Sequence, residues 1–331
     1  GSLELLENAF HNCVSLEEIT IPENVNSIGS YAFAKCEGLT SIELPNSITS
    51  ISWCAFEGCT NLTSINIPIN MEIIEDGAFR FTGLSSIVIP ENITSINPYA
   101  FADCPNLKSV KLSNNLINIG EYAFSETNIT SIQIPSKVTS IGVKAFDSGK
   151  SLISITVDKN NPIYDSRNNC NAIIETKTNT LIQGCQNTVI PNDITNIGKL
   201  AFSGCENLKS ITIPNGIKTI GSQAFWCCTN LASMTIPSTV TNIEDSAFAH
   251  CSSLTNIVIP SSVTTIGSYA FSYCENLINI TLPNTITSIA PGMLMNCSSI
   301  EYMVLPNSIK TIDERAFENC TNLKDITIPD G

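Results

Sequence analysis

Apolar residues recur along this chain in short units, and the spacing between them changes within each unit. Residues 39–59, LTSIELPNSITSISWCAFEGC, show one complete instance. The alternation of Ile42 and Leu44 predicts a short strand with one face inward. Pro45 ends this strand, because proline has no N–H for a neighbouring strand. A second extended piece and a brief helical turn follow, and the residues expected to point inward are Leu39, Ile42, Leu44, Ile48, Ile51, Ala55, Phe56 and Cys59.

The same pattern repeats through the whole sequence, at spacings of 22 or 23 residues with one gap of 56. Its marker residues are Phe10, Phe33, Phe56, Phe79, Phe101, Phe124, Phe146, Phe202, Phe225, Phe248, Phe271, Leu294 and Phe317. Each unit buries one stripe and is too small to fold alone, so stacked neighbours must supply the core. We therefore expect an α/β solenoid, a right-handed superhelix of ~23-residue units with short parallel strands along one face and short helical turns.

The helical turn is expected to begin just before each Ala-Phe pair. Ser52 and Asn97 are residues that favour a helix N-cap, and Pro98 follows at the first helical position, where proline is tolerated. Carboxylate pairs fall at the same place, and we interpret them as complements of the helix dipole rather than as an acid–base pair. These pairs are Glu75 and Asp76, Glu244 and Asp245, and Asp313 and Glu314.

The gap of 56 residues contains an irregular unit at about 158–186. Apolar runs at 172–175 and 180–183 flank a polar Thr-Lys-Thr-Asn loop, which predicts a β-hairpin. We expect a single solenoid domain over residues 1–331 that carries this hairpin as a lateral projection. The sequence begins and stops within a repeat and shows no polar cap, so we also expect a fragment of a longer protein.

Composition and charge exclude several classes of partner. The chain is 43% hydrophobic and only 14% charged, and its 16 basic residues are scattered among 30 acidic ones to give a net charge of −14. A protein that binds nucleic acid or an anionic membrane surface needs clustered lysine and arginine. No apolar run approaches the ~18 residues of a transmembrane helix, so this segment is not expected to insert into a membrane, and no signal peptide is visible.

Ten of the fourteen cysteines occupy one slot, three residues after the repeat Phe or Leu. They are Cys13, Cys36, Cys59, Cys104, Cys205, Cys228, Cys251, Cys274, Cys297 and Cys320. Thr82, Thr127 and Gly149 take the same slot elsewhere, which indicates a need for small volume rather than thiol chemistry. Outside the slot, Cys170 and Cys185 flank the predicted hairpin and are candidates for a disulfide in an oxidising compartment.

Motifs of catalysis and cofactor binding are absent from the sequence. The two histidines, His11 and His250, have no nucleophile partner by motif, and no Gly-x-Ser-x-Gly, HExxH, P-loop or GxGxxG occurs. Asp158 and Asp165 lie near several asparagines, but their spacing matches no calcium loop. We predict a non-enzymatic protein with no metal and no cofactor.

The repeat, I(x)IP-(x)3-TSIG-(x)2-AF-(x)2-C, resembles the BspA-type leucine-rich repeat over nearly the whole chain. One instance runs Ile259-Pro260…Thr265-Ile266-Gly267…Ala270-Phe271…Cys274. The resemblance implies a surface or secreted protein of a host-associated bacterium, extracellular or at the cell surface. It also implies adhesion through a protein ligand, such as a host matrix or cell-surface protein. The family has no shared catalytic or ligand residues to carry over.

The aromatic residues offer the best candidate contact surface, since the outward strand positions carry mostly small hydroxyl and amide side chains. Protein-binding hot spots favour Trp, Tyr and Arg. The rings expected beside the helical turn are Tyr31, Trp53, Tyr99, Tyr122, Trp226, Tyr269 and Tyr273. Three functions stay open at this stage: protein binding by an adhesin, a passive stalk or spacer, and glycan binding. Several of these rings could also serve only to pack along that edge.

Overall fold

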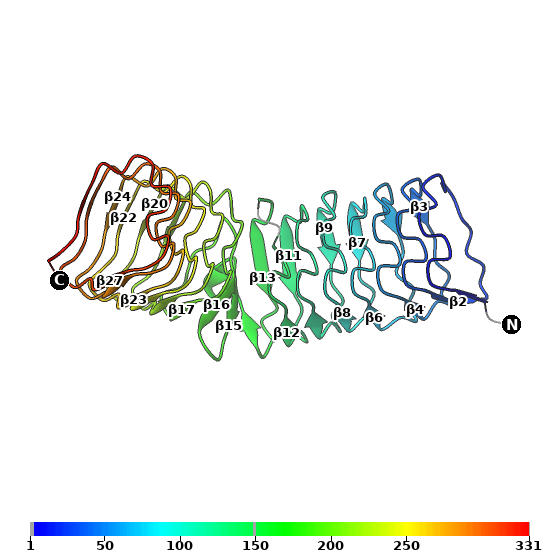
Figure 1. Ribbon diagram of the computed structural model, residues 1–331. Helices are drawn as coiled ribbons and strands as arrows, with labels where there is room; N and C mark the ends of the chain where they lie inside the picture. Colours follow the sequence, from blue (N-terminus) through cyan, green and yellow to red (C-terminus); the bar gives the residue numbers. More distant parts are fainter. Residues whose placement is uncertain (1–2, 148–149, 331) are drawn as a thin grey trace. The chain divides into compact units, whose positions relative to one another are not determined.

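Figure 1 shows a computed structural model of the chain, which describes residues 3–147 and 150–330. The chain divides into two compact units, Gly1–Tyr164 and Asp165–Gly331. Each unit is a β-solenoid, in which the backbone winds through successive coils and places two short strands in almost every coil. That the two units form one domain stays a prediction.

The first strand row comes from the segment before each Ile-Pro or Leu-Pro. Its parallel pairs are β3 with β5, β7 with β9 and β11 with β13 in the first unit, and β18 with β20, β22 with β24 and β26 with β28 in the second. The bounds are β3 Ser41–Ile42, β5 Ser64–Ile65, β7 Ser86–Val88, β9 Ser109–Lys111, β11 Ser131–Ile134, β13 Ser154–Val157, β18 Ser210–Thr212, β20 Ser233–Thr235, β22 Asn256–Val258, β24 Asn279–Thr281, β26 Tyr302–Val304 and β28 Asp325–Thr327. Burial alternates along these strands as the sequence pattern predicts, with Ile132 and Ile134 of β11 inside.

The second strand row comes mostly from the Ser-Ile, Thr-Ile or Asn-Ile dipeptide that follows the first strand row in each coil. Its bounds are β1 Leu3–Leu5, β2 Val25–Ile28, β4 Ser50–Ile51, β6 Ile73–Ile74, β8 Ser95–Ile96, β10 Asn118–Ile119, β12 Ser140–Ile141, β17 Asn196–Ile197, β19 Thr219–Ile220, β21 Asn242–Ile243, β23 Thr265–Ile266, β25 Ser288–Ile289 and β27 Thr311–Ile312. Four consecutive strands of this row pair in parallel as β6-β8-β10-β12 in the first unit, and four more as β17-β19-β21-β23 in the second. The sequence predicts strands along one face, and the structure has two rows because the second extended piece also pairs with its neighbours.

A ladder of buried phenylalanine rings fills the space behind the Ala-Phe turns. In the first unit, consecutive rings from Phe10 to Phe146 stack with centroids 5.1 to 5.7 Å apart. In the second unit, the rings from Phe202 to Phe271 stack at 5.1 to 5.3 Å. Parallel stacking follows from the repeat itself, since every coil places its ring at the same position above the previous one.

The prediction of a helical turn at the Ala-Phe pair is wrong. Residues such as Tyr31 and Lys35 have positive φ angles of 55° and 60°, and an α-helix of L-residues needs a negative φ throughout. The Ala32 N–H donates to the Gly29 carbonyl three residues back, as in a β-turn with positive φ at its third residue. This region is therefore a succession of tight turns. The only helix among the described residues is a short 3-10 segment, η1, at Arg167–Asn169.

Every second amide of these turns bonds to the next coil instead of to its own. The Phe33 N–H donates to the Ala55 carbonyl at 2.8 Å, and the Phe56 N–H donates to the Ala78 carbonyl at 2.9 Å. Because Ala55 and Phe56 share one peptide group, that group accepts from one coil and donates to the following one. An α-helix would have used these amides within the coil, so the bonds between coils are what exclude it.

The carboxylates expected at helix starts also bond between coils. The Asn97 Nδ2 donates to Glu75 Oε2 at 2.9 Å. The Ser222 N–H donates to Glu244 at 2.9 Å, and the Ser268 N–H donates to Asp245 at 2.8 Å. Their structural role is therefore to cap the amides and amide side chains of the adjacent coil.

The cysteine slot holds a hydrogen-bond donor as well as a small side chain. For eight of the ten slot cysteines the thiol donates to the carbonyl of the marker residue one coil back, as Cys59 does to Phe33 at 3.0 Å and Cys251 does to Phe225 at 3.2 Å. Burial raises the pKa of the Cys59 thiol to about 12, which keeps it protonated as a donor at neutral pH. A small side chain without a donor could not make this hydrogen bond. Gly149, which takes the slot in one unit, lies outside the described residues.

Threonine takes the slot in coils that are one residue shorter. Leu84 follows the repeat Phe by five residues, whereas Leu62 follows Phe56 by six. In such a coil the Thr82 hydroxyl donates to the Phe79 carbonyl of its own coil at 2.9 Å. Thr127 makes the same bond to Phe124 at 2.8 Å. The length of the loop after the slot thus decides whether the donor reaches back one coil or stays within its own.

The irregular region contains β14 (Tyr164–Asp165), η1 and an antiparallel hairpin of β15 (Ile173–Glu175) and β16 (Thr180–Gln183). In the second unit, β16 pairs in parallel with β17 and so joins the hairpin to the regular coils. The Arg167 guanidinium bonds to Asp165 at 2.6 Å and to Asp193 at 2.6 Å, and this contact holds the pKa of Asp193 below its ordinary value. The hairpin is therefore fixed to the regular coils by backbone bonds, and η1 by an ionic contact.

Cys170 and Cys185 are buried thiols at the base of this hairpin. The Cys170 Sγ donates to the Ala172 carbonyl at 3.9 Å, and the Cys185 Sγ donates to the Asn171 carbonyl at 3.4 Å. Burial raises the pKa of the Cys170 thiol to about 11. Their pairing in an oxidising compartment stays a prediction.

Candidate contact surface

The predicted rings lie on what we call the turn face, the surface formed by the residues from four positions before each marker Phe or Leu to three positions after it. They form separate clusters rather than one continuous stripe. Tyr31 and Trp53 contact each other, with ring centroids 5.0 Å apart and ring planes 66° apart. The His11 ring adds an edge contact to Tyr31 at 6.4 Å. Trp53 keeps 52% of its surface exposed, so the middle of this first cluster is open to solvent.

A second cluster lies on the turn face of the first unit around Arg80. Tyr99 and Tyr122 stack with centroids 5.0 Å apart and ring planes at 9°. The Arg80 guanidinium lies 4.6 Å from the Phe81 ring centroid and 5.2 Å from the Tyr99 centroid. Its Nε also donates to Asp103 at 2.9 Å. Phe81 and Tyr99 remain 41% and 38% exposed, so this cluster also presents rings to solvent.

The third cluster lies in the second unit and is held together by a histidine. The His250 ring stacks on Tyr273 with centroids 4.3 Å apart, and the edge of Trp226 meets His250 at 5.9 Å. Tyr269 stands apart from this stack and lies over Gly292, where a Cβ atom would come within 2.2 Å of the tyrosine ring. All four side chains are only partly exposed. Packing within the unit thus uses much of their surface.

The predicted set of rings leaves out four members of these clusters, His11, Arg80, Phe81 and His250. Arg80, Phe81 and His250 sit one or two positions after the repeat Phe, whereas most of the predicted rings sit two or three positions before it. The consecutive tight turns bring both sets to the same face. The predicted Trp226 and Tyr273 occupy the same positions after the repeat Phe, so those positions were the available signal for Arg80, Phe81 and His250.

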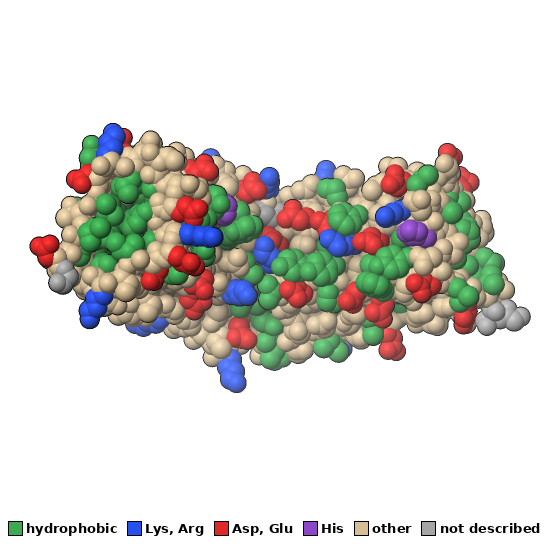
Figure 2. Space-filling view, viewed as in Figure 1, with side chains coloured by type: hydrophobic (Ala, Val, Ile, Leu, Met, Phe, Trp, Pro, Cys, Tyr) green, Lys and Arg blue, Asp and Glu red, His purple; other side chains and the backbone are tan. Residues whose placement is uncertain are grey.

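Carboxylates surround the rings on the turn face of the first unit. The acidic side chains there are Glu7, Glu57, Glu75, Asp76, Asp103, Glu121, Glu126 and Asp147, and the cationic ones are Lys35, Arg80 and Lys144. Eight minus three leaves a formal charge of −5. Figure 2 shows hydrophobic side chains alternating with acidic ones over this unit. The turn face therefore combines exposed rings with a negative potential.

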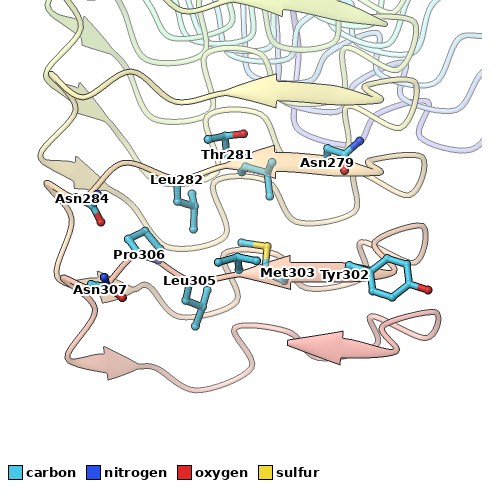
Figure 3. A pocket seen from close by; sticks show the side chains of 11 residues that line it. Asn279, Thr281, Leu282, Asn284, Tyr302, Met303, Leu305, Pro306 and Asn307 are labelled. Atoms are coloured by element: carbon cyan, nitrogen blue, oxygen red, sulfur yellow. The ribbon is translucent and has the colours of Figure 1, made fainter. Parts of the chain in front are cut away.

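A pocket of about 500 Å³ opens in the first strand row of the second unit, between β24 and β26. These two strands belong to different pairs, so the ladder of hydrogen bonds is interrupted there. Figure 3 shows Leu282 and Leu305 on facing sides of the pocket, with Asn279, Thr281 and Tyr302 along its strands. Its lining contains no carboxylate, imidazole, amine or thiol.

The family model for the BspA-type leucine-rich repeat region matches residues 4–84, 72–180, 173–301 and 241–331. The chain belongs to the BspA-type leucine-rich repeat family. This BspA-type chain is 30% identical to a leucine-rich cell surface protein from Faecalibacterium prausnitzii, over 93% of this chain and 86% of that one, with a TM-score of 0.67. A leucine-rich repeat protein from Eubacterium ventriosum is 25% identical over 89% and 85% of the two chains, also with a TM-score of 0.67.

The fold of this BspA-type chain also resembles that of the pneumococcal vaccine antigen PcpA. The two are 20% identical over 99% of this chain and 92% of that one, with a TM-score of 0.76. A comparison with curated proteins found no match. Of these similar proteins, the one from Faecalibacterium prausnitzii is named as a cell surface protein. Within residues 3–147 and 150–330 of this chain, no helix has the length and apolar character needed to cross a bilayer.

The histidine in the third cluster makes the stability of this BspA-type chain depend on pH. Burial lowers the pKa of His250 below its ordinary value, although Glu275 opposes the shift. The unfolded chain then takes up a proton near pH ~6.5, before the folded chain does. The free energy of unfolding should therefore decrease as the pH falls from about 6.5 toward the folded pKa.

Replacing His250 with phenylalanine is expected to remove this decrease and to keep the stack on Tyr273. Urea unfolding of both proteins between about pH 5 and pH 7.5 measures the effect. The difference in stability between variant and parent should grow in favour of the variant as the pH falls. A difference that stays constant over this range would contradict the assignment.

Proposed function

We propose that this chain is a non-enzymatic binding protein of a bacterial cell surface, and that its turn face contacts a protein ligand. The observation that carries the proposal is the half-exposed Trp53 ring, held against Tyr31 in the first cluster. Surface tryptophans that are fixed by neighbouring side chains bind with little loss of conformational freedom. Tryptophan, tyrosine and arginine also dominate binding energy at protein interfaces, and the first two clusters contain all three.

The location and the kind of ligand rest on similarity to other proteins. One relative is named as a cell surface protein, and its identity of 30% extends over most of both chains. We infer a surface or secreted location for this chain, and adhesion to a host matrix protein or a neighbouring cell as its role. A solenoid of repeats supports such a role because it presents a long, rigid surface.

A spacer is the second candidate function, and the strand rows favour it. Their outward positions carry short polar side chains such as Ser64, Ser131 and Ser210, which offer little binding energy. Under this hypothesis the rings of the turn face only pack against one another. Glycan binding is a third candidate, since sugars stack on exposed rings such as Trp53.

A binding panel separates these three functions. The purified chain is tested against extracellular matrix proteins, intact cells and glycans, and the best ligand is then titrated against variants. Trp53→Ala and Tyr99→Ala are each expected to weaken binding by about tenfold or more, the range of an interface hot spot. Tyr302→Ala is the matched control, because Tyr302 is 63% exposed but lies on a strand row.

The control should change the affinity by about twofold or less. Equal losses in all three variants would remove the turn face as the binding surface. A folded, monomeric protein that binds nothing in the panel would favour the spacer. Binding to glycans alone would replace the protein ligand with a carbohydrate.

A further inference from the structure

The rings of the turn face are suited to a particular chemical group, and one such group already occupies them. The Arg80 guanidinium lies over both Phe81 and Tyr99 while its Nε donates to Asp103. A cation over an aromatic ring is favourable, and arginine adds a directed hydrogen bond to a carboxylate. The second cluster thus shows, within the protein itself, how this surface accommodates an arginine side chain.

The first cluster has the same components without an arginine of its own. Trp53 and Tyr31 supply the rings, and Glu57 lies in the same turn as Trp53. Asp76 belongs to the adjoining coil, where its carbonyl accepts the Cys54 N–H at 3.0 Å. Residues 52–74, the coil that carries Trp53, include no lysine and no arginine. Rings and carboxylates therefore occur together here as in the second cluster, and the cation nearest in sequence to these rings is Lys35 of the Tyr31 coil rather than an arginine.

We propose that the turn face of the first unit binds an extended, arginine-bearing segment of a partner protein. This inference rests on the proposed protein-binding function and specifies the chemistry of the ligand. The formal charge of −5 on the face attracts a basic segment, and the exposed rings give arginine an advantage over lysine. A neutral or acidic segment would gain neither contribution.

The spacing of the clusters sets the spacing of the arginines. Trp53 and Tyr122 belong to coils three steps apart, and coils stacked as parallel strands are ~4.8 Å apart, so the two coils lie about 14 Å apart. An extended chain advances ~3.3 Å per residue, so about four residues span this distance. Two arginines four positions apart in the ligand would therefore reach the coils of Trp53 and Tyr122.

Synthetic peptides provide the test. The probe is a dodecapeptide of glycine and serine with arginine at every fourth position, and its counterparts carry lysine, glutamate or serine there. Binding to the whole chain is followed by calorimetry and by Trp53 fluorescence in a Trp226→Phe background. We expect the arginine peptide to bind most tightly, the lysine peptide more weakly and the other two not measurably. Higher salt should weaken binding, because the attraction between exposed charges is screened.

Two sets of substitutions with equal change in net charge locate the site. E57Q, D76N and E121Q together neutralise three carboxylates of the turn face beside the rings. E18Q, E43Q and E72Q together neutralise three exposed carboxylates of the same unit that lie away from that face. The first set, and Trp53→Ala, should each weaken the arginine peptide by about tenfold, and the second set by about twofold or less. Thermal melts confirm that each variant is folded.

Equal losses in the two charge sets would overturn the proposal, because they would indicate diffuse attraction to an acidic protein. Equal affinity for the arginine and lysine peptides would also overturn it, since the rings would then play no part. A protein from the panel that binds through Trp53 but is insensitive to the E57Q, D76N and E121Q set would overturn this inference while leaving the proposed function in place. Failure of the whole panel would remove the proposed function itself.

Discussion

Replacing Phe248 with alanine is expected to lower the free energy of unfolding by about 3–5 kcal/mol, the cost of removing a large side chain from a packed core. Phe248 is fully buried, and its ring stacks on Phe225 and on Phe271 with centroids 5.3 Å away on both sides. Neither neighbour can close the cavity, because each is held at its own coil by the backbone bonds of the turn face. Equilibrium unfolding in urea measures the loss.

Phe248→Leu is the matched control, because it keeps an apolar side chain at that position and leaves a smaller cavity. Leucine already serves as the marker residue at Leu294, where it is fully buried. The control should therefore cost clearly less than Phe248→Ala. If Phe248→Ala cost less than about 1 kcal/mol, the ring ladder would not be a main source of stability.

Replacing Gly184 with alanine is expected to destabilise the second unit by about 1–3 kcal/mol, the usual cost of overpacking a core. A Cβ atom at this position would lie 2.2 Å from Cε1 of Phe202 and 2.6 Å from its Cζ. The backbone cannot retreat, since the Gly184 N–H donates to the Ala201 carbonyl at 2.7 Å. The Phe202 ring is itself held by its stack on Phe225 at 5.1 Å.

A double substitution tests whether this contact is the cause. Phe202→Leu removes the ring edge that the new methyl group would meet, so Gly184→Ala should cost less in that background than in the parent. The measurement is a double-mutant cycle in urea, and the expected coupling is about 1 kcal/mol. Additive costs would show that Gly184 is required for another reason.

The repeat and its inward residues could be predicted from the sequence, and the structure confirms them. Ile42, Leu44, Ile48, Ile51 and Phe56 are all buried. These positions are predictable because each follows from a local alternation that a dozen units repeat. The solenoid class then follows from stacking, since a single unit cannot bury its stripe.

The helical turn could not be judged correctly from local signals. Ser52 and Asn97 favour turns as much as helix N-caps, because both bond to nearby backbone groups in either setting. Whether the segment forms a helix or turns depends on backbone amides such as that of Phe33, which donates to a neighbouring coil. The positive φ angles of Tyr31 and Cys54 could not be predicted from the sequence either, since neither residue type favours a positive φ.

The candidate contact surface could be predicted only in outline. The register placed Tyr31 and Trp53 on one edge, and the structure brings them together. It could not place Arg80 over Phe81 and Tyr99, because that contact depends on how long side chains from adjacent coils fold over one another. Tyr269 illustrates the reverse case, a predicted ring whose neighbour is a glycine rather than another ring.

The backbone hydrogen bonds between the turns of successive coils give each stack of turns an electric dipole. Every peptide group of the kind formed by Ala55 and Phe56 accepts from the lower-numbered coil and donates to the higher-numbered one. Aligned peptide dipoles add, and hydrogen bonds in a chain polarise one another. Each stack of turns therefore carries a macrodipole with its positive end toward higher residue numbers. The described residues contain no α-helix, yet each stack of turns has the polarity of one.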